Sequence, residues 1–286
     1  MTQPIRARAA NISAVVSDVD GSLVTGGKVL TERAKAAVVE LRANGVDFTI
    51  ISSRPPRGMR MLLEPLGITK PIGCFNGAVI ARPDLTPISQ HLLSPDVARS
   101  AIEMLDKHGV QVWVFADQQW LVRHSDGPYI EREQSTVGFQ PTVVADFSAF
   151  LGTAAKIVGS GADFLLLTKC EGDVRTALSG QATVVRSQLY YLDITHLLAN
   201  KGDGLSELSK LLGVPLAEIA VIGDGSNDVA MFERAGLSIA MGNASDEVKA
   251  RASAVTDNNE AEGFANAIRK FILCQAPHER LSPRNA

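Results

Sequence analysis

The chain has 286 residues, 45% of them hydrophobic, and its 28 basic and 31 acidic residues leave a net charge of −3. This length suggests about two domains. The lack of a basic excess and an aromatic content of 5% argue against a nucleic-acid-binding surface. No apolar run approaches the roughly 20 residues of a membrane span, and the N-terminus lacks a signal peptide's apolar stretch. We therefore expect a soluble protein that contacts neither membranes nor nucleic acid.

The N-terminal part alternates predicted strands and helices. A short buried strand is predicted at 14–18, and apolar residues at helical spacing predict a helix at 31–44. A β-branched run at 46–52 predicts a second strand, followed by a helix at about 57–66 and a short strand at 72–75. This alternation predicts a doubly wound α/β core with a parallel sheet.

The middle of the chain has a different pattern. Ser94 is a suitable N-cap for a predicted helix at 94–108, and hairpins are predicted around Asp117-Gln118 and near 182–194. A helix combined with paired antiparallel strands is typical of an α+β domain. We therefore divide the chain into the first part of the core at 1–82, an inserted α+β domain at 83–195, and the second part of the core at 196–286.

The strand and helix alternation returns after residue 200. Helices are predicted at about 203–212 and 226–235, each followed by a glycine, and strands at 220–223 and 237–241. Two more helices are expected after these, and the last dozen residues are expected to form a disordered tail.

The three cysteines are Cys74, Cys170 and Cys274, with no CxxC pair and no histidines at ligand spacing. This distribution fits neither a disulfide framework nor a zinc site. We expect buried thiols in a protein of the reducing cytoplasm.

Two carboxylates follow the first predicted strand, in the sequence Asp18-Val19-Asp20-Gly21. Side chains at i and i+2 of an extended chain point to the same side, and ligands bind at the carboxyl ends of strands in α/β sheets. Gly21 permits a sharp exit of the chain. A polar turn after a strand explains the same residues, so this motif alone decides nothing.

Two weaker signals carry groups that can hold a phosphate. Ser52 and Ser53, at the end of the second predicted strand, offer a hydroxyl and a backbone N–H. Lys201, before the helix predicted at 203–212, offers a positive charge. The ordinary explanations are a serine-rich strand end and a solvated lysine.

An acidic turn, GDGSND at 223–228, follows the strand predicted at 220–223. Its two acids and its amide suit a hard divalent cation such as Mg²⁺, which takes oxygen ligands in an octahedral array. The alternative is an Asp-rich turn that caps the next helix.

The order of these motifs is more specific than any one of them. In the order DxDGS, SSR, NG at Asn76-Gly77, KG and GDGSND, the chain resembles the haloacid dehalogenase (HAD) superfamily hydrolases. More narrowly, it resembles the Cof-type subfamily IIB, with a C2B cap inserted between the second and third motifs. The likeness extends to LDIT before the lysine, MGNA at 241–244 and VTDNNEAEGFANAI at 255–268. It implies a HAD-like, Rossmannoid core, a cap at 83–195, and a Mg²⁺-dependent phosphatase of small phosphorylated metabolites.

The resemblance also implies roles for individual residues. The implied catalytic residues are Asp18 as the phosphorylated nucleophile, Asp20 as general acid and base, and Lys201. The implied phosphate-binding residues are Ser52, Ser53, Lys201 and Asn227. The implied metal ligands are Asp18, Asp20 through its backbone carbonyl, and Asp224, with Asp228 reaching the metal through water or a hydrogen bond. Ser52-Ser53 replaces the family's usual Thr-Gly, and THLLAN replaces the usual approach to the lysine.

The chemistry asks for different charge states at the two carboxyls of the first motif. Mg²⁺ and Lys201 offset the repulsion between the Asp18 carboxylate and a phosphate dianion. Asp20 has to be protonated when substrate binds, and we expect neighbouring negative charge to raise its pKa.

Two other functions remain open at this stage. A phosphotransferase or mutase resembling the phosphomannomutases uses the same phosphoaspartate but requires a bisphosphorylated sugar activator. A non-catalytic binding module would be favoured by loss of an acid from DxD, and neither acid is lost.

The sequence leaves the substrate and the oligomeric state open. Sugar phosphates are the expected substrates, because the resemblance favours them and the predicted inner face of the cap carries no dense cluster of Arg and Lys. The candidate specificity residues are Arg123, His124, Arg186 and Tyr190, each of which a surface or strand-packing role explains equally well.

Overall fold

The computed structural model describes residues 12–273, so Cys274 and the tail predicted for the last dozen residues lie outside the described part. The core contains a five-stranded parallel sheet with the strand order β14-β13-β12-β1-β2. Its strands are β1 (Ala14–Ser17), β2 (Asp47–Ile50), β12 (Ile219–Gly223), β13 (Leu237–Ala240) and β14 (Ala254–Val255). The predicted α/β core is confirmed.

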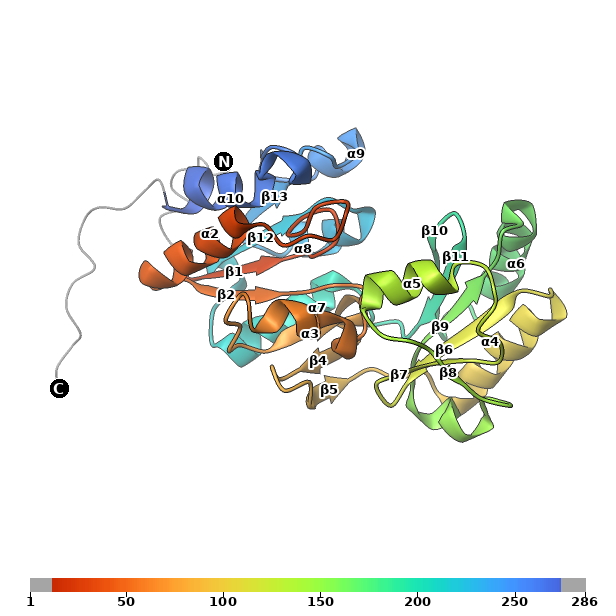
Figure 1. The fold of residues 1–286 in the computed structure, drawn as a ribbon. Helices are drawn as coiled ribbons and strands as arrows, with labels where there is room; N and C mark the ends of the chain where they lie inside the picture. The colour runs from red at the N-terminus through yellow and green to blue at the C-terminus, as the bar shows by residue number, and fades with distance from the viewer. Residues whose placement is uncertain (1–11, 274–286) are drawn as a thin grey trace.

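Helices cover both faces of this sheet (Figure 1). Within β1, Val15 packs into the apolar cluster shared with α2 (Glu32–Ala43) and α10 (Gly263–Ala267). Ala14 and Val16 pack into a second cluster with α7 (Lys201–Leu212) and α8 (Val229–Phe232). Successive residues of a strand point to opposite faces, so a wholly apolar strand is buried from both sides.

Three short strands form a separate antiparallel sheet beside the core. They are β3 (Ile72–Cys74), β4 (Val79–Ala81) and β5 (Pro87–Gln90), and they follow α3 (Pro56–Leu63). The strand predicted at 72–75 is therefore present, but it is not a full member of the parallel sheet and is linked to it by an isolated bridge between Ile51 and Gly73. It pairs mainly with β4.

The cap contains a six-stranded, mainly antiparallel sheet with the order β10-β11-β9-β6-β7-β8. Its strands are β6 (Gln111–Ala116), β7 (Gln119–Val122), β8 (Thr142–Val143), β9 (Ala154–Ser160), β10 (Thr183–Gln188) and β11 (Tyr191–Thr195). Its helices are α4 (Pro95–Lys107), α5 (Ile130–Val137) and α6 (Phe164–Ala177). Side chains of α4 and α6 pack on one sheet face. Aromatic side chains of the other face pack into the cluster shared with the core.

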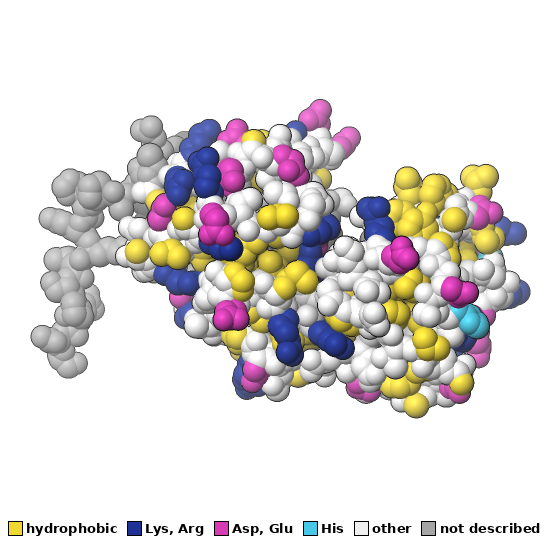
Figure 2. All heavy atoms as spheres, viewed as in Figure 1, with side chains coloured by type: hydrophobic (Ala, Val, Ile, Leu, Met, Phe, Trp, Pro, Cys, Tyr) yellow, Lys and Arg dark blue, Asp and Glu magenta, His cyan; other side chains and the backbone are white. Residues whose placement is uncertain are grey.

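Several predicted features of the cap are confirmed. The strands β6 and β7 pair as a hairpin, as do β10 and β11. The Ser94 hydroxyl accepts a hydrogen bond from the backbone N–H of Val97 and caps α4. Exposed apolar side chains gather at the outer end of the cap, over the β10–β11 hairpin and the start of α6 (Figure 2).

The chain passes twice between core and cap. The imidazole rings of His91 and His196 stack at these crossings, with their centroids 5.4 Å apart. The domain boundaries at 82/83 and 195/196 stay predictions, and β5, which that division assigns to the cap, hydrogen bonds to β4. Within 12–273, no helix has both the length and the apolar character required to cross a membrane.

Candidate active site

The centre of the site is an ion-paired cluster at the carboxyl edge of the parallel sheet. Asp18 directly follows β1, and Asp224 directly follows the neighbouring strand β12, so both carboxyls lie at one edge. Lys201, at the start of α7, donates from Nζ to Asp18 Oδ1 at 2.5 Å and to Asp228 Oδ1 at 2.6 Å. Lys201 is 1% exposed and Asp18 is 5% exposed, so water screens these charges little.

The carboxyl group of Asp228 is fully committed within the protein. Its Oδ2 accepts from the backbone N–H groups of Asp224 at 2.9 Å and Gly225 at 2.8 Å, while its Oδ1 binds Lys201. These bonds close the acidic turn on itself. As a result, the helix predicted at 226–235 is a 3₁₀ turn followed by the short α8. Asp228 therefore lies deeper than Asp18 and Asp224, which line the cavity.

Asp224 is held from two sides. The Ser22 hydroxyl donates to its Oδ1 at 3.0 Å, and Asn243 Nδ2 donates to its Oδ2 at 3.1 Å. Asn243 also donates to the carbonyl oxygen of Gly21 at 2.9 Å, which ties the first motif to the MGNA segment. Gly21 has a φ of +84°, and a Cβ atom there would lie 2.2 Å from Asp224 Oδ2, so only glycine fits.

Carboxylate oxygens of Asp18, Asp224 and Asp228 all lie within 4.8 Å of one another. Burial raises the pKa of Asp18 well above its usual range; Lys201 opposes this shift, and the two other acids add to it. Burial and Asp228 also raise the pKa of Asp224. The three carboxyl groups share the positive charge of one lysine, so the cluster as a whole lacks positive charge. The atoms that these groups offer to a metal are all oxygen. The residues present therefore fit a divalent metal ion.

The Asp20 carboxylate is held by two cations. Arg54 donates to it from Nε and Nη2, both at 2.7 Å, and Lys28 Nζ donates at 2.7 Å. Burial raises the pKa of Asp20, but the bonds and charges of Arg54 and Lys28 outweigh burial and lower it. The expectation that neighbouring negative charge would raise this pKa is wrong, because the groups that contact Asp20 are cations.

The residues predicted to hold the phosphoryl group lie around this cluster. Ser53 and Asn227 line the cavity above it. Ser52 is 1% exposed, and its hydroxyl accepts from the backbone N–H of Arg54 at 3.2 Å, so it lies beneath the cavity surface. Asn227 Nδ2 donates to Asn76 Oδ1 at 3.1 Å, which joins the NG motif to the acidic turn.

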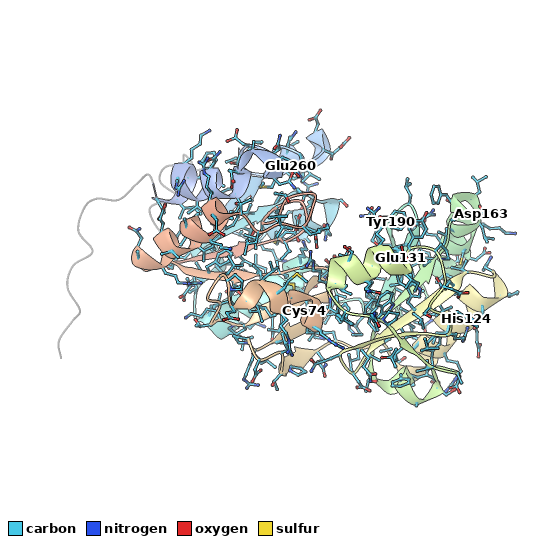
Figure 3. The ribbon with its side chains drawn as sticks, in the orientation of Figure 1. Cys74, His124, Glu131, Asp163, Tyr190 and Glu260 are labelled. Atoms are coloured by element: carbon cyan, nitrogen blue, oxygen red, sulfur yellow. The ribbon has the colours of Figure 1, made fainter. Side chains whose placement is uncertain are left out.

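A cavity of about 590 Å³ lies between core and cap, and residues of both line it. Of the four candidate specificity residues, Arg186 and Tyr190 line it. Arg123 instead pairs with Asp106 through two hydrogen bonds. His124 lies on the side of the cap remote from the core (Figure 3).

Sequence reasoning assigned no role to four residues that shape the site: Ser22, Lys28, Arg54 and Asn243. Ser22, Arg54 and Asn243 stand inside the motifs DxDGS, SSR and MGNA, so a signal for them was present. Lys28 belongs to no motif, and its positive φ of 63° in the loop after Asp20 is visible only in the structure.

The fold and the site together define a capped, doubly wound α/β protein with an acidic centre at the carboxyl edge of its parallel sheet. Residues 15–268 match the family of haloacid dehalogenase-like hydrolases. The chain belongs to this family. This confirms the resemblance to the haloacid dehalogenase hydrolases found in the motifs.

Known proteins are similar along most of the chain. The pyridoxal phosphate phosphatase YbhA of Escherichia coli is 26% identical over 91% of this chain and 98% of its own. A haloacid dehalogenase-like hydrolase from Bacteroides thetaiotaomicron is 26% identical, with a TM-score of 0.85, covering 91% of this chain and all of the other. The subclass IIB sugar phosphatase BT4131 shares the fold, with a TM-score of 0.78 at 22% identity, covering 91% and 98%. The protein is accordingly a phosphoric monoester hydrolase.

Proposed function

We propose that the protein hydrolyses small phosphomonoesters, with sugar phosphates as the main class, through an aspartyl-phosphate intermediate on Asp18 and with Mg²⁺ as cofactor. The observation that carries this proposal is the buried Asp18 carboxylate, which is ion-paired to Lys201 and within reach of Asp224. A carboxylate attacks a phosphate dianion only where positive charge offsets their repulsion.

The residues divide the work as follows. Asp18 attacks the phosphorus atom, and Lys201 stabilises negative charge on the phosphoryl oxygens. Asp18 and Asp224, with the Asp20 carbonyl, would hold the metal ion, which supplies further positive charge at the phosphoryl group. The Ser53 backbone and Asn227 would contact the phosphoryl oxygens at the cavity surface, and the Ser52 hydroxyl would contact them from beneath it. The relative that acts on pyridoxal phosphate supports a small phosphorylated metabolite as substrate.

Asp20 serves both steps as acid and base. With its pKa lowered by Arg54 and Lys28, it is ionised in the free protein, the state required to deprotonate the water that attacks the aspartyl phosphate. An arriving phosphate dianion neutralises part of the charge of these two cations. This raises the pKa of Asp20 and lets it protonate the leaving oxygen.

The cavity supports a substrate of sugar-phosphate size. Its volume of about 590 Å³ lies within the roughly 300–1,000 Å³ typical of small-molecule sites. Cap and core both line it, so the core holds the phosphoryl group while the cap contacts the leaving group. We also propose that the cap domain comprises residues 83–195.

A substrate panel with purified protein tests the proposal. We expect Mg²⁺-dependent phosphate release from several hexose and pentose monophosphates, with modest selectivity and no requirement for a sugar bisphosphate. Full activity in EDTA would refute the metal assignment. A strict need for a bisphosphate activator would instead identify a mutase, and a preference of several orders of magnitude for nucleotides or flavin mononucleotide would refute the substrate class.

A further inference from the structure

Asp193, in β11 of the cap, has one carboxylate oxygen with no hydrogen-bond donor among the described residues. The residue is 7% exposed and lines the cavity. Its Oδ2 is bound by Lys156 Nζ at 2.6 Å, whereas its buried Oδ1 has no partner. Leaving a buried acceptor unsatisfied costs about 1–3 kcal/mol, so the lack of a partner for this oxygen needs an explanation.

Two other charged groups of the cap line the same cavity. Lys156 comes from β9 and Glu133 from α5, and both line the same cavity as Asp193 in β11, so three cap elements contribute. Burial raises the pKa of Glu133; Lys156 opposes this shift and Asp193 adds to it. Trp113 also lines the cavity, and its buried indole N–H has no acceptor among the described residues.

Of the three cap cations that line the cavity among the described residues, two are already engaged by protein acceptors. Lys156 is already paired with Asp193. The guanidinium of Arg186 donates to the carbonyl oxygens of Leu189 and Phe164. The guanidinium of Arg132 lies over the ring of Tyr190, 5.1 Å from its centroid. Because Asp193 and Glu133 both line the cavity from the cap, this part of it disfavours an anionic leaving group.

We propose that Asp193 and Lys156, with Glu133 beside them, bind the hydroxyl groups of the substrate's leaving group. A hydroxyl donates to Asp193 Oδ1 and accepts from Lys156 Nζ, so a neutral polyol uses both groups. An ammonium group only donates, so it could use Asp193 Oδ1 but not Lys156 Nζ. This inference rests on the proposed phosphatase function and assigns its specificity to named cap residues.

The first test compares Asp193→Asn with wild type on glucose 6-phosphate and on p-nitrophenyl phosphate, whose leaving group carries no additional hydroxyl. The Asn side chain can bind Lys156 through its oxygen, but it then turns an N–H₂ donor toward the position of Oδ1. We expect the ratio of kcat/KM values, glucose 6-phosphate over p-nitrophenyl phosphate, to fall by about 10- to 100-fold. An unchanged ratio in folded Asp193→Asn would overturn the inference.

Asp106→Asn is the matched control, because it breaks another cap ion pair, with Arg123, at residues that do not line the cavity. We expect this variant to keep the wild-type ratio. An equal fall in the ratio for both variants would mean that any disturbance of the cap lowers this ratio. That result would overturn the inference.

The second test needs no variant and covers the case in which Asp193→Asn does not fold. Monodeoxy forms of glucose 6-phosphate are compared with the parent on wild-type protein, and we expect at least one to lose about tenfold or more in kcat/KM. Equal values for all forms, or a preference for glucosamine 6-phosphate, would overturn the inference. Failure of the phosphatase proposal differs from both results, because wild type would then release no phosphate from p-nitrophenyl phosphate.

Discussion

Lys201 is the most constrained side chain of the site, because its ammonium group lies between the carboxylates of Asp18 and Asp228. The two carboxylates raise the pKa of this buried lysine even though burial alone would lower it. The ion pairs therefore keep Lys201 charged in a place where an isolated ammonium group would lose its proton.

Lys201→Met should lower both the stability and the rate. Removing one partner of a buried ion pair leaves uncompensated charge, so we expect a loss of about 3–5 kcal/mol in the free energy of unfolding, measured with urea in EDTA. The double variant Lys201→Met/Asp228→Asn should recover part of this loss. The rate should also fall at saturating substrate, because the lysine acts on the transition state. A change confined to KM would contradict this role.

Asp18→Asn should abolish turnover, by about 10⁴-fold or more, because it removes the nucleophile without changing the volume. Well-folded protein with substantial hydrolysis would rule out the aspartyl-phosphate mechanism.

The same variant has a distinct effect on stability. Because the folded state raises the pKa of Asp18, it binds this proton more tightly than the unfolded chain does. Between the ordinary and the raised pKa of Asp18, this group therefore stabilises the fold as pH falls and destabilises it as pH rises. In EDTA, wild type should lose more stability than Asp18→Asn when pH rises through this window. Equal slopes of melting temperature against pH would contradict the shift.

The sequence predicted which residues form the site better than it predicted their charge states. Asp18, Asp224 and Lys201 could be found because each stands at a strand end or helix start that the apolar pattern also predicts. The cations around Asp20 could not be found in this way. Arg54 folds back from beyond the second strand, and Lys28 reaches Asp20 from a loop without periodicity.

At the scale of elements, the position of α7 depends on a close approach to the NG motif. A Cβ atom on Gly204 would lie 2.7 Å from the Cα atom of Gly77 and 2.8 Å from Ile51 Cδ1. Lys201 and Asn76 lie on the two segments that meet here. The spacing of these backbones thus fixes the distance between the lysine and the acidic turn.

Gly204→Ala should separate these segments. We expect a loss of about 1–3 kcal/mol in the free energy of unfolding, together with reduced activity. Gly172→Ala in α6 is the control, since a Cβ there meets nothing within 4 Å and alanine favours a helix by about 0.5–1 kcal/mol. Similar losses from both substitutions would contradict the close-approach argument.

Elements with a continuous apolar run buried on both faces were predictable, whereas two helices of the cap were not. The strands of the β6–β7 hairpin are buried along nearly their whole length. By contrast, neither α5 nor α6 was predicted from the sequence. In α6, Leu165 belongs to an apolar run yet is 84% exposed, so the run does not mark a buried stripe.

At the scale of the whole molecule, cap and core share an apolar cluster to which aromatic rings contribute. The rings of Phe75 and Phe115 meet edge to face at 5.6 Å, and Arg57 lies 4.5 Å from the ring centroid of Phe139. The sequence predicted an inserted domain but not its inner surface. Which side chains face the cavity depends on the register of β9, β10 and β11, and no local pattern specifies that register.

Because positive charge is short among Asp18, Asp224 and Asp228, the thermal stability of the core should report binding of its cation. Any ion that binds only the folded chain stabilises it by mass action, by about 2.7 kcal/mol at a concentration 100 times its dissociation constant. Mg²⁺ alone should therefore raise the melting temperature, without any substrate, and the midpoint should climb with the logarithm of its concentration. Asp224→Asn should require more Mg²⁺ for the same rise. Identical curves for the two proteins would remove Asp224 from the ligand set.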